Sequence, residues 1–176
     1  MDIEKIATSS IENLLSRNPY LRTKIDSNDK TTVWDGDIFV YCSKEPNKKN
    51  DDLLGKVPVQ VKGRKVETIE NLNLKKIKFR VKKDDVKKYL TDGGVIYFVV
   101  CMDEKKEEIF YNSLLPLDLA RLIKRYKNQN SFEIEFKPLP KTDVKLADIF
   151  VDFIKNRQKQ QGTLIPDILC FEDFKK

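Results

Sequence analysis

Histidine is absent from this chain of 176 residues, and cysteine occurs only three times. The lack of imidazole excludes Ser-His-Asp triads, histidine general bases and histidine-ligated zinc sites. Cys42, Cys101 and Cys170 are far apart in the sequence, so they form no paired motif and do not complete a tetrahedral zinc site. We expect them to be reduced residues of the core. The chemistry that remains depends on carboxylates, lysines and hard metal ions.

Long hydrophobic runs are also lacking, and none approaches the roughly 20 residues needed to cross a bilayer. Residues 1–5 do not have the basic and apolar regions of a signal peptide. We therefore expect a cytoplasmic protein without membrane partners. A charged fraction of 35% beside 10% aromatic residues indicates a folded chain rather than a disordered one. The length suits one domain over residues 1–176, either a whole protein or the N-terminal part of a longer one.

Hydrophobic periodicity predicts helices at residues 2–17, 84–90, 116–126 and 145–159, and strands at 34–41, 57–63, 77–81, 95–101, 108–111 and 132–136. The continuous apolar run at 95–101 is typical of a strand covered on both faces, which places it at the centre of the sheet. The clean alternation at 132–136 predicts an exposed edge strand. Residues 43–52 are expected to form a polar excursion between paired strands, and 64–76 are ambiguous. The order predicts an α/β or α+β domain with a mixed central sheet flanked by helices.

The net charge of +6 is distributed unevenly along the chain. Residues 60–90 contain eleven Lys or Arg against four acidic residues, a local net charge of +7. Such a concentration suits a polyanion, whose phosphate backbone these side chains would position without reading its sequence. The candidates are Arg64, Lys65, Lys75, Lys76, Lys78 and Arg80, with Lys82 and Lys83 beyond them. A solvated lysine-rich face that serves only solubility explains the same charge equally well.

Two strands carry polar side chains in a pattern that suits hydrolysis with a hard metal ion. In the strand at 57–63, Gln60 and Lys62 share one face by the two-residue period, opposite the valines. In the strand before it, Asp35 and Asp37 share a face. Pairing of the two strands would bring a carboxylate, an amide and an ammonium together. Phosphodiester hydrolysis needs a carboxylate ligand, a second oxygen ligand and a cation near the reacting water or the developing charge.

A helix, then an Asp on a strand, then Gln-x-Lys on the neighbouring strand resembles the PD-(D/E)XK nuclease superfamily, in the Gln-x-Lys variant of Mrr-like restriction nucleases. The chain also resembles nuclease-like domains at the N-terminus of bacterial proteins, many of them anti-phage or unassigned. The matching residues are 28–30 (Asn-Asp-Lys), 34–36 (Trp-Asp-Gly), 38, 40–41 and 59–63 (Val-Gln-Val-Lys-Gly). The resemblance covers roughly residues 1–100 and implies a restriction-endonuclease-like fold.

The resemblance implies a deoxyribonuclease that uses Mg²⁺ or Mn²⁺. It makes Asp35 the first choice for the metal carboxylate, with Asp37 as the alternative, and the backbone carbonyl near Val61 is a further ligand. Lys62 would polarise the scissile phosphate or stabilise the attacking hydroxide. Most members of the superfamily have Asp or Glu at the position of Gln60. A neutral amide is a weaker ligand for Mg²⁺, which predicts weak or single-metal binding.

The superfamily usually adds a Glu from the first helix. The interval of 23 residues to Asp35 favours Glu12 as this catalytic and metal-binding residue. Glu4 borders the apolar face of the helix and is the alternative. A migrated carboxylate from Glu67 or Glu70 is a third source, if the segment after the Gln-x-Lys strand folds back.

Three functions from different classes are compatible with these observations. The first is a metal-dependent endonuclease domain that cuts DNA with little sequence specificity in bacterial defence or restriction. RNA is an open alternative substrate, and a homodimer, a C-terminal sensor or ATPase region, or a partner protein would complete the assembly. The second is a catalytically decayed nuclease-fold module that binds nucleic acid, with DNA binding that survives Lys62→Ala. The third is a protein-interaction domain whose lysine-rich face binds an acidic partner.

Overall fold

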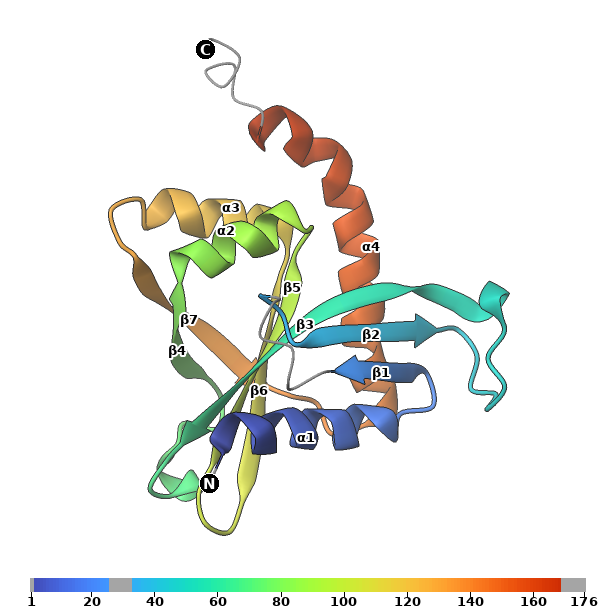
Figure 1. Ribbon diagram of the computed structural model, residues 1–176, viewed down its shortest axis with the longest axis horizontal. Helices are drawn as coiled ribbons and strands as arrows, with labels where there is room; N and C mark the ends of the chain where they lie inside the picture. Colours follow the sequence, from blue (N-terminus) through green and yellow to red (C-terminus); the bar gives the residue numbers. More distant parts are fainter. Residues whose placement is uncertain (1, 26–32, 169–176) are drawn as a thin grey trace.

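The computed structural model describes residues 2–25 and 33–168, with residues 162–168 described by backbone alone. Within these ranges the chain forms one seven-stranded mixed sheet with four α-helices packed against it. The predicted α/β class with a mixed central sheet is therefore confirmed. Figure 1 shows α2 and α3 together at one end of the molecule and α1 at the other, with the sheet between them.

The helices are α1 (Ile3–Ser16), α2 (Lys83–Thr91), α3 (Pro116–Arg125) and α4 (Asp143–Ile168). The strands are β1 (Leu21–Ile25), β2 (Gly36–Tyr41), β3 (Leu53–Lys65), β4 (Ile77–Lys82), β5 (Val95–Met102), β6 (Glu107–Leu114) and β7 (Ser131–Pro138). Their order in the sheet is β1-β2-β3-β5-β6-β7-β4, and only β3 and β5 are parallel among the described neighbours. Every predicted helix and strand is present, and β3 and α4 are longer than predicted. No helix in the described part of the chain is long and apolar enough to cross a membrane.

Strand β1 is missing from the sequence prediction. It has five residues, two of them basic, so its alternating pattern is too short to stand out. Its strand conformation depends on antiparallel pairing with β2, from Leu21 opposite Val40 to Ile25 opposite Gly36. The pairing is so close that a Cβ on Gly36 would lie 2.2 Å from the carbonyl oxygen of Lys24. Glycine is therefore required here for strand packing.

The prediction that residues 132–136 form an edge strand is wrong. β7 lies between β4, which pairs along most of its length, and β6, which pairs at Phe110–Pro138 and Tyr111–Lys137. The alternation of the sequence is real, because Phe132, Ile134 and Phe136 are buried and the residues between them are exposed. Such alternation reports that one face is solvated, and does not report whether both edges are paired.

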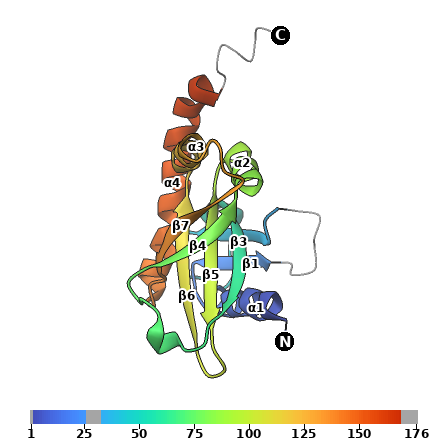
Figure 2. The ribbon, with the colours of Figure 1, turned by 90° about the vertical axis from the view of Figure 1, so that its left-hand side faces the viewer.

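Two hydrophobic clusters hold the helices to the sheet, and β5 contributes to both. Ile96, Phe98 and Val100 of β5 join the first cluster, which includes apolar residues of α1, β3 and α4. The alternate residues of β5 join the second, which includes residues of α2, α3, β4 and β7. All eight residues of β5 are buried, so its predicted central position is confirmed. Figure 2 shows α2 and α3 side by side above these strands.

The cysteines are only partly as predicted. Cys101 is buried in β5 and has no disulfide partner. Cys42 is exposed, so the prediction of a core residue is wrong there. It directly follows β2, where the register with β3 shifts between Val40 and Tyr41, so the alternation that buries Val40 does not continue to Cys42. Cys170 lies outside the described residues.

Candidate active site

Asp35 lies immediately before β2, where β2 begins beside β3 (Figure 1). Its backbone N–H donates to the carbonyl oxygen of Val59 at 2.9 Å. Its carboxylate oxygen Oδ2 accepts two hydrogen bonds from β3, from Gln60 Nε2 at 2.7 Å and from the backbone N–H of Val61 at 2.6 Å. The structure therefore brings Asp35 into direct contact with the Gln-x-Lys strand.

Burial is the largest influence on the charge of Asp35. It raises the pKa of this carboxyl above the ordinary value of 3.8, against the opposing effects of the Val61 hydrogen bond and of the charge on Lys62. The negative charge of Glu4 adds to the rise in the pKa. A half-buried carboxylate with a raised pKa is stabilised by a cation placed beside it.

Gln60 is 3% exposed and lies in a network of buried polar groups. Its Nε2 is also 3.3 Å from the carbonyl oxygen of Val61, and its Oε1 accepts a hydrogen bond from the hydroxyl of Tyr89 at 3.2 Å. The Tyr89 hydroxyl is 3.4 Å from the carbonyl oxygen of Val33. The sequence did not distinguish Tyr89 from an ordinary core aromatic, since only the packing of α2 on the sheet places it at Gln60.

Lys62 pairs with Glu4 of α1, not with Glu12. The distance from Lys62 Nζ to Glu4 Oε2 is 3.8 Å, and both side chains are substantially exposed. Glu4 Oε2 also accepts a hydrogen bond from the backbone N–H of Gly63 at 3.4 Å. Glu12 is exposed and lies about 12 Å further along the helix axis. The alternative residue Glu4 therefore replaces Glu12 as the helix carboxylate nearest Lys62.

Gly63 allows α1 to approach the end of β3. A Cβ at this position would lie 2.7 Å from the carbonyl oxygen of Ile3, a contact that the backbone cannot relieve without moving. We expect Gly63→Ala to lower the free energy of unfolding by about 1–3 kcal/mol, as other overpacked sites do. Urea denaturation measures this change. Lys65→Ala, at an exposed position of the same strand, is the control, and an equal effect of both substitutions would contradict the steric argument.

Asp37 belongs to a different group of charges. Its Oδ2 lies 3.5 Å from Lys56 Nζ, and it also acts electrostatically on Asp92 and Arg157. Asp35 precedes it by two residues, about 7 Å along a strand. The structure therefore does not bring Asp37 into the contacts that join Asp35 to Gln60.

The residues at Asp35 fit one hard cation rather than a two-metal centre. Asp35 Oδ2 and the Val61 carbonyl oxygen both face Gln60 Nε2, so two oxygen atoms converge on one position. Mg²⁺ commonly binds through one or two carboxylates and completes its shell with water and substrate phosphate oxygens. The described residues contain no group of three or more His, Cys, Asp or Glu side chains able to hold a metal ion. Metal binding at this position stays a prediction.

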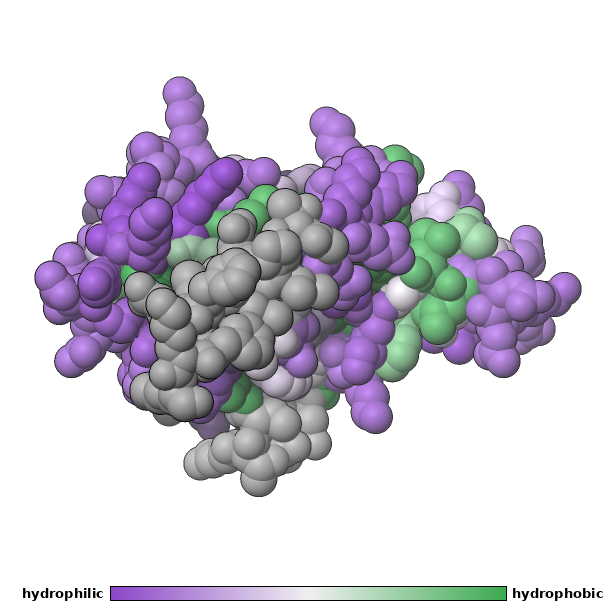
Figure 3. Space-filling model, turned by 90° about the horizontal axis from the view of Figure 1, so that it is seen from above, coloured by the Kyte–Doolittle hydropathy of each residue, from purple (hydrophilic) through white to green (hydrophobic). Residues whose placement is uncertain are grey.

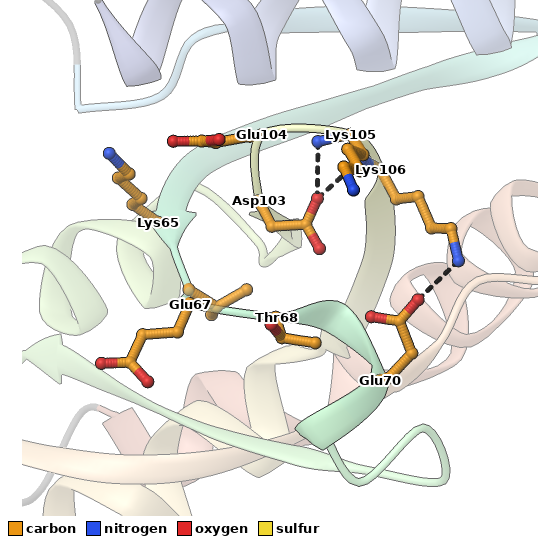
Figure 4. Close-up of a pocket in the computed structure, with 9 residues that line it drawn as sticks. Lys65, Glu67, Thr68, Glu70, Asp103, Glu104, Lys105 and Lys106 are labelled. Carbon is orange, nitrogen blue, oxygen red and sulfur yellow. Dashed lines mark hydrogen bonds and ion pairs between the residues drawn. The ribbon is translucent and has the colours of Figure 1, made fainter.

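Glu67 and Glu70 follow the end of β3 and line an open hollow of about 690 Å³ (Figure 4). Glu70 pairs with Lys106 from the turn between β5 and β6 at 2.5 Å. Asp103, on the wall of the hollow, accepts hydrogen bonds from the backbone N–H groups of Ile69, Lys105 and Lys106. Lys65, also on its wall, is five residues beyond Gln60 on β3, about 16 Å at the rise of a strand. Neither glutamate therefore supplies a migrated carboxylate to Asp35.

The predicted basic surface is partly neutralised by acidic residues of β7. Lys76 pairs with Glu135 at 2.6 Å. Lys78 lies opposite Glu135 and Arg80 opposite Glu133 in the antiparallel register of β4 and β7. Cross-strand pairs of opposite charge reduce the positive potential available to a polyanion. The strand β4 is therefore a weaker candidate for phosphate contacts than its own sequence predicts.

The remaining candidates lie near the ends of β3 and β4. Arg64 is exposed and its Nη1 donates to the carbonyl oxygen of Lys78 at 3.2 Å, which ties β3 to β4. Lys65 and Lys75 are also exposed. Figure 3 shows a hydrophilic surface over α2 and α3, whereas hydrophobic side chains gather toward the β2–β3 end. The exposed cations Arg64, Lys65 and Lys75 are therefore the candidates for phosphate contacts that remain.

Comparisons with models of protein families, with curated proteins and with solved structures find no match to this chain. The Asn-Asp-Lys residues 28–30, which carry part of the motif resemblance, lie outside the described residues. The functional interpretation therefore depends on the contacts of Asp35, Gln60 and Lys62 and on the remaining motif residues.

Proposed function

We propose that this protein is a metal-dependent endonuclease of the PD-(D/E)XK type, in its Gln-x-Lys variant, and that it hydrolyses phosphodiester bonds of DNA. The observation that carries the proposal is the hydrogen bonding of Asp35 to Gln60 and to the backbone of Val61, which directly precedes the partly exposed Lys62. A half-buried carboxylate held against a Gln-x-Lys strand is the arrangement that the motif resemblance implies. The resemblance also supports a role in bacterial defence or restriction.

Each residue of the site has a defined role in this proposal. Asp35, the Val61 carbonyl and the Gln60 amide would hold one Mg²⁺ or Mn²⁺, which supplies Lewis-acid polarisation of the phosphate and a more acidic bound water. Lys62 presents a positive charge where charge develops on the phosphate oxygens. Glu4 orients Lys62 through their ion pair. The exposed cations at the ends of β3 and β4 position the DNA backbone without sequence specificity.

Supercoiled plasmid incubated with the protein and Mg²⁺ or Mn²⁺ tests the proposal. We expect relaxed circles, and no relaxed circles with EDTA. One such site cuts one strand, so linear product that forms at the start of the reaction, before nicks accumulate, would indicate a homodimer.

A decayed nucleic-acid-binding module is the second candidate, because the single carboxylate faces an amide nitrogen rather than a second acid. Salt-sensitive DNA binding without cleavage in either metal would favour it over the nuclease. No affinity for DNA at low salt would favour a protein-interaction domain instead.

Exchange of glutamate for glutamine at two positions of α1 tests the helix carboxylate. We expect Glu4→Gln to lower the rate of plasmid nicking about tenfold, because Lys62 loses its ion-pair partner. Glu12→Gln is the matched control, with the same chemical change on the same helix and an expected effect below twofold. A larger loss of nicking in Glu12→Gln than in Glu4→Gln would reverse this assignment.

A further inference from the structure

The amide of Gln60 has a defined orientation in this structure. Its nitrogen faces Asp35 Oδ2 at 2.7 Å and the Val61 carbonyl oxygen at 3.3 Å, and its oxygen faces the hydroxyl of Tyr89 at 3.2 Å. A carboxylate and a carbonyl are acceptors only, so in the absence of a cation they select the NH₂ end of the amide. This orientation gives every buried polar side-chain atom in the described residues a partner.

The same orientation is unsuitable for a cation. An amide nitrogen does not ligate Mg²⁺ or Mn²⁺, and here it occupies the position on which the two oxygens of Asp35 and Val61 converge. Rotation of the amide by half a turn would place Oε1 beside those two oxygens. Three oxygen atoms would then face one position, an arrangement that repels unless a cation lies between them.

Tyr89 has the hydrogen-bonding capacity to accept both orientations. Its hydroxyl lies 3.2 Å from Gln60 Oε1 and 3.4 Å from the carbonyl oxygen of Val33, and its single proton reaches only one of these acceptors at a time. After rotation, the amide nitrogen donates to the Tyr89 oxygen, and the phenolic proton is free to donate to Val33. Both contacts are then hydrogen bonds, so the rotated amide loses no partner on this side.

The hydroxyl is held in place by the packing of α2. Tyr89 is 2% exposed and its ring meets that of Tyr97 edge to face at 6.3 Å between centroids. A tyrosine hydroxyl carries its proton at neutral pH. A protonated hydroxyl is both donor and acceptor, which is what the two orientations require in turn.

We propose that Tyr89 is a positioning residue that allows the Gln60 amide to turn over when a divalent cation binds at Asp35. This inference rests on the proposed function, because it requires that the site bind a cation. The Gln60 amide therefore has two orientations. Without a cation its nitrogen occupies the cation position, and with a cation its oxygen completes the ligand set. The affinity for the cation includes the free-energy cost of the rotation.

Isothermal titration with Mn²⁺ tests the proposal in the wild type, Tyr89→Phe, Gln60→Glu and the double variant, beside one control. We expect Tyr89→Phe to weaken Mn²⁺ binding about tenfold. The hydroxyl makes one hydrogen bond without a cation and two after the rotation, so its removal costs the cation-bound state one hydrogen bond more. Gln60→Glu should bind Mn²⁺ more tightly, since a carboxylate presents an oxygen in either orientation. Tyr89→Phe should then cause no weakening in the Gln60→Glu background. Tyr97→Phe, which removes a hydroxyl from the same core, is the control for packing and should leave the affinity unchanged.

The orientation itself is measurable by NMR with diamagnetic Mg²⁺. The side-chain amide signal of Gln60 is identified by its loss in Gln60→Glu, and its protons should gain cross-peaks to the Tyr89 ring when Mg²⁺ is added. Wild-type protein that binds Mn²⁺ with the same affinity as Tyr89→Phe would overturn this inference and leave the proposed function standing. Wild-type protein that binds no Mn²⁺ at all would overturn both.

Discussion

Replacement of Asp35 by asparagine is expected to abolish DNA cleavage and, at neutral pH, to stabilise the fold. Asparagine retains an oxygen that accepts the hydrogen bonds from Gln60 and Val61, but it removes the charge that we propose binds the cation. We expect the nicking rate to fall about 10³-fold, within the range for loss of a group that stabilises developing charge. The free energy of unfolding should rise by about 0.5–2 kcal/mol, as often occurs when a functional site is relieved of strain.

The gain in stability should depend on pH in a direction that the pKa of Asp35 determines. Folding raises this pKa, so the folded protein holds a proton on the carboxyl more tightly than the unfolded chain does. In the wild type, stability is therefore gained as the pH falls through the folded-state pKa toward 3.8, and lost as the pH rises through the same range. The advantage of Asp35→Asn should be largest near pH 7 and should shrink as the pH is lowered.

Thermal unfolding of both proteins between pH 4 and 8, beside plasmid nicking, measures the two effects. Asp92 also has a raised pKa, but it is present in both proteins, so its contribution cancels in the comparison. Asp37→Asn is the matched control on the same stretch of chain. It should retain nicking and gain no stability, because Asp37 pairs with Lys56. An Asp35→Asn protein that still nicks plasmid, or a loss of nicking only in Asp37→Asn, would refute the role of Asp35.

The contact between Asp35 and Gln60 followed from simple periodicity. Two-residue alternation placed Gln60 opposite the valines of β3, and antiparallel pairing of β2 with β3 brings Asp35 beside it. The buried state of Gln60 was not predictable in the same way. It results from the packing of α2, whose Tyr89 covers the amide from a helix that begins almost twenty residues after the end of β3.

The structure brings Glu4, rather than the preferred Glu12, to Lys62 for a physical reason. Helical periodicity gives the angle of a side chain around α1, and a count of residues to Asp35 does not give its height along the helix relative to β3. That height is set by the close contact of Ile3 with Gly63, which brings the first turn of α1, and hence Glu4, to Lys62. A glycine in a strand was the available signal, since it marks a close approach of another backbone.

The charge of the protein surface is a second property that the sequence alone predicts incompletely. The basic residues of β4 form a continuous patch when the chain is read in order, but their neighbours in space come from β7, more than fifty residues later. Glu133 and Glu135 lie opposite Arg80 and Lys78, so local net charge overestimates the positive potential there. Charge patterns predict a binding surface only when the partner strands are known.

Replacement of Lys62 by methionine should give the second large effect, a loss of cleavage of about 10²-fold or more with DNA binding nearly intact. Methionine keeps most of the length of the side chain but removes the charge that we propose faces the phosphate. Lys62 is partly exposed and its only ion pair within the described residues is with Glu4 at 3.8 Å, so we expect a change in stability below about 1 kcal/mol. The loss of cleavage would therefore not result from unfolding.

Lys65→Met is the control that distinguishes a catalytic role of the Lys62 charge from a general electrostatic attraction of DNA. Lys65 lies on the same strand and is exposed, so its loss removes one positive charge from the same region. The slope of log K for DNA binding against log salt concentration reports the number of phosphate contacts, and each substitution should reduce that number by about one at most. Only Lys62→Met should lower the rate of nicking at saturating DNA. Equal rates for the two variants would mean that Lys62 contributes to binding alone. If both variants still bind DNA and only Lys62→Met loses nicking, the result supports a position of Lys62 at the reacting phosphate.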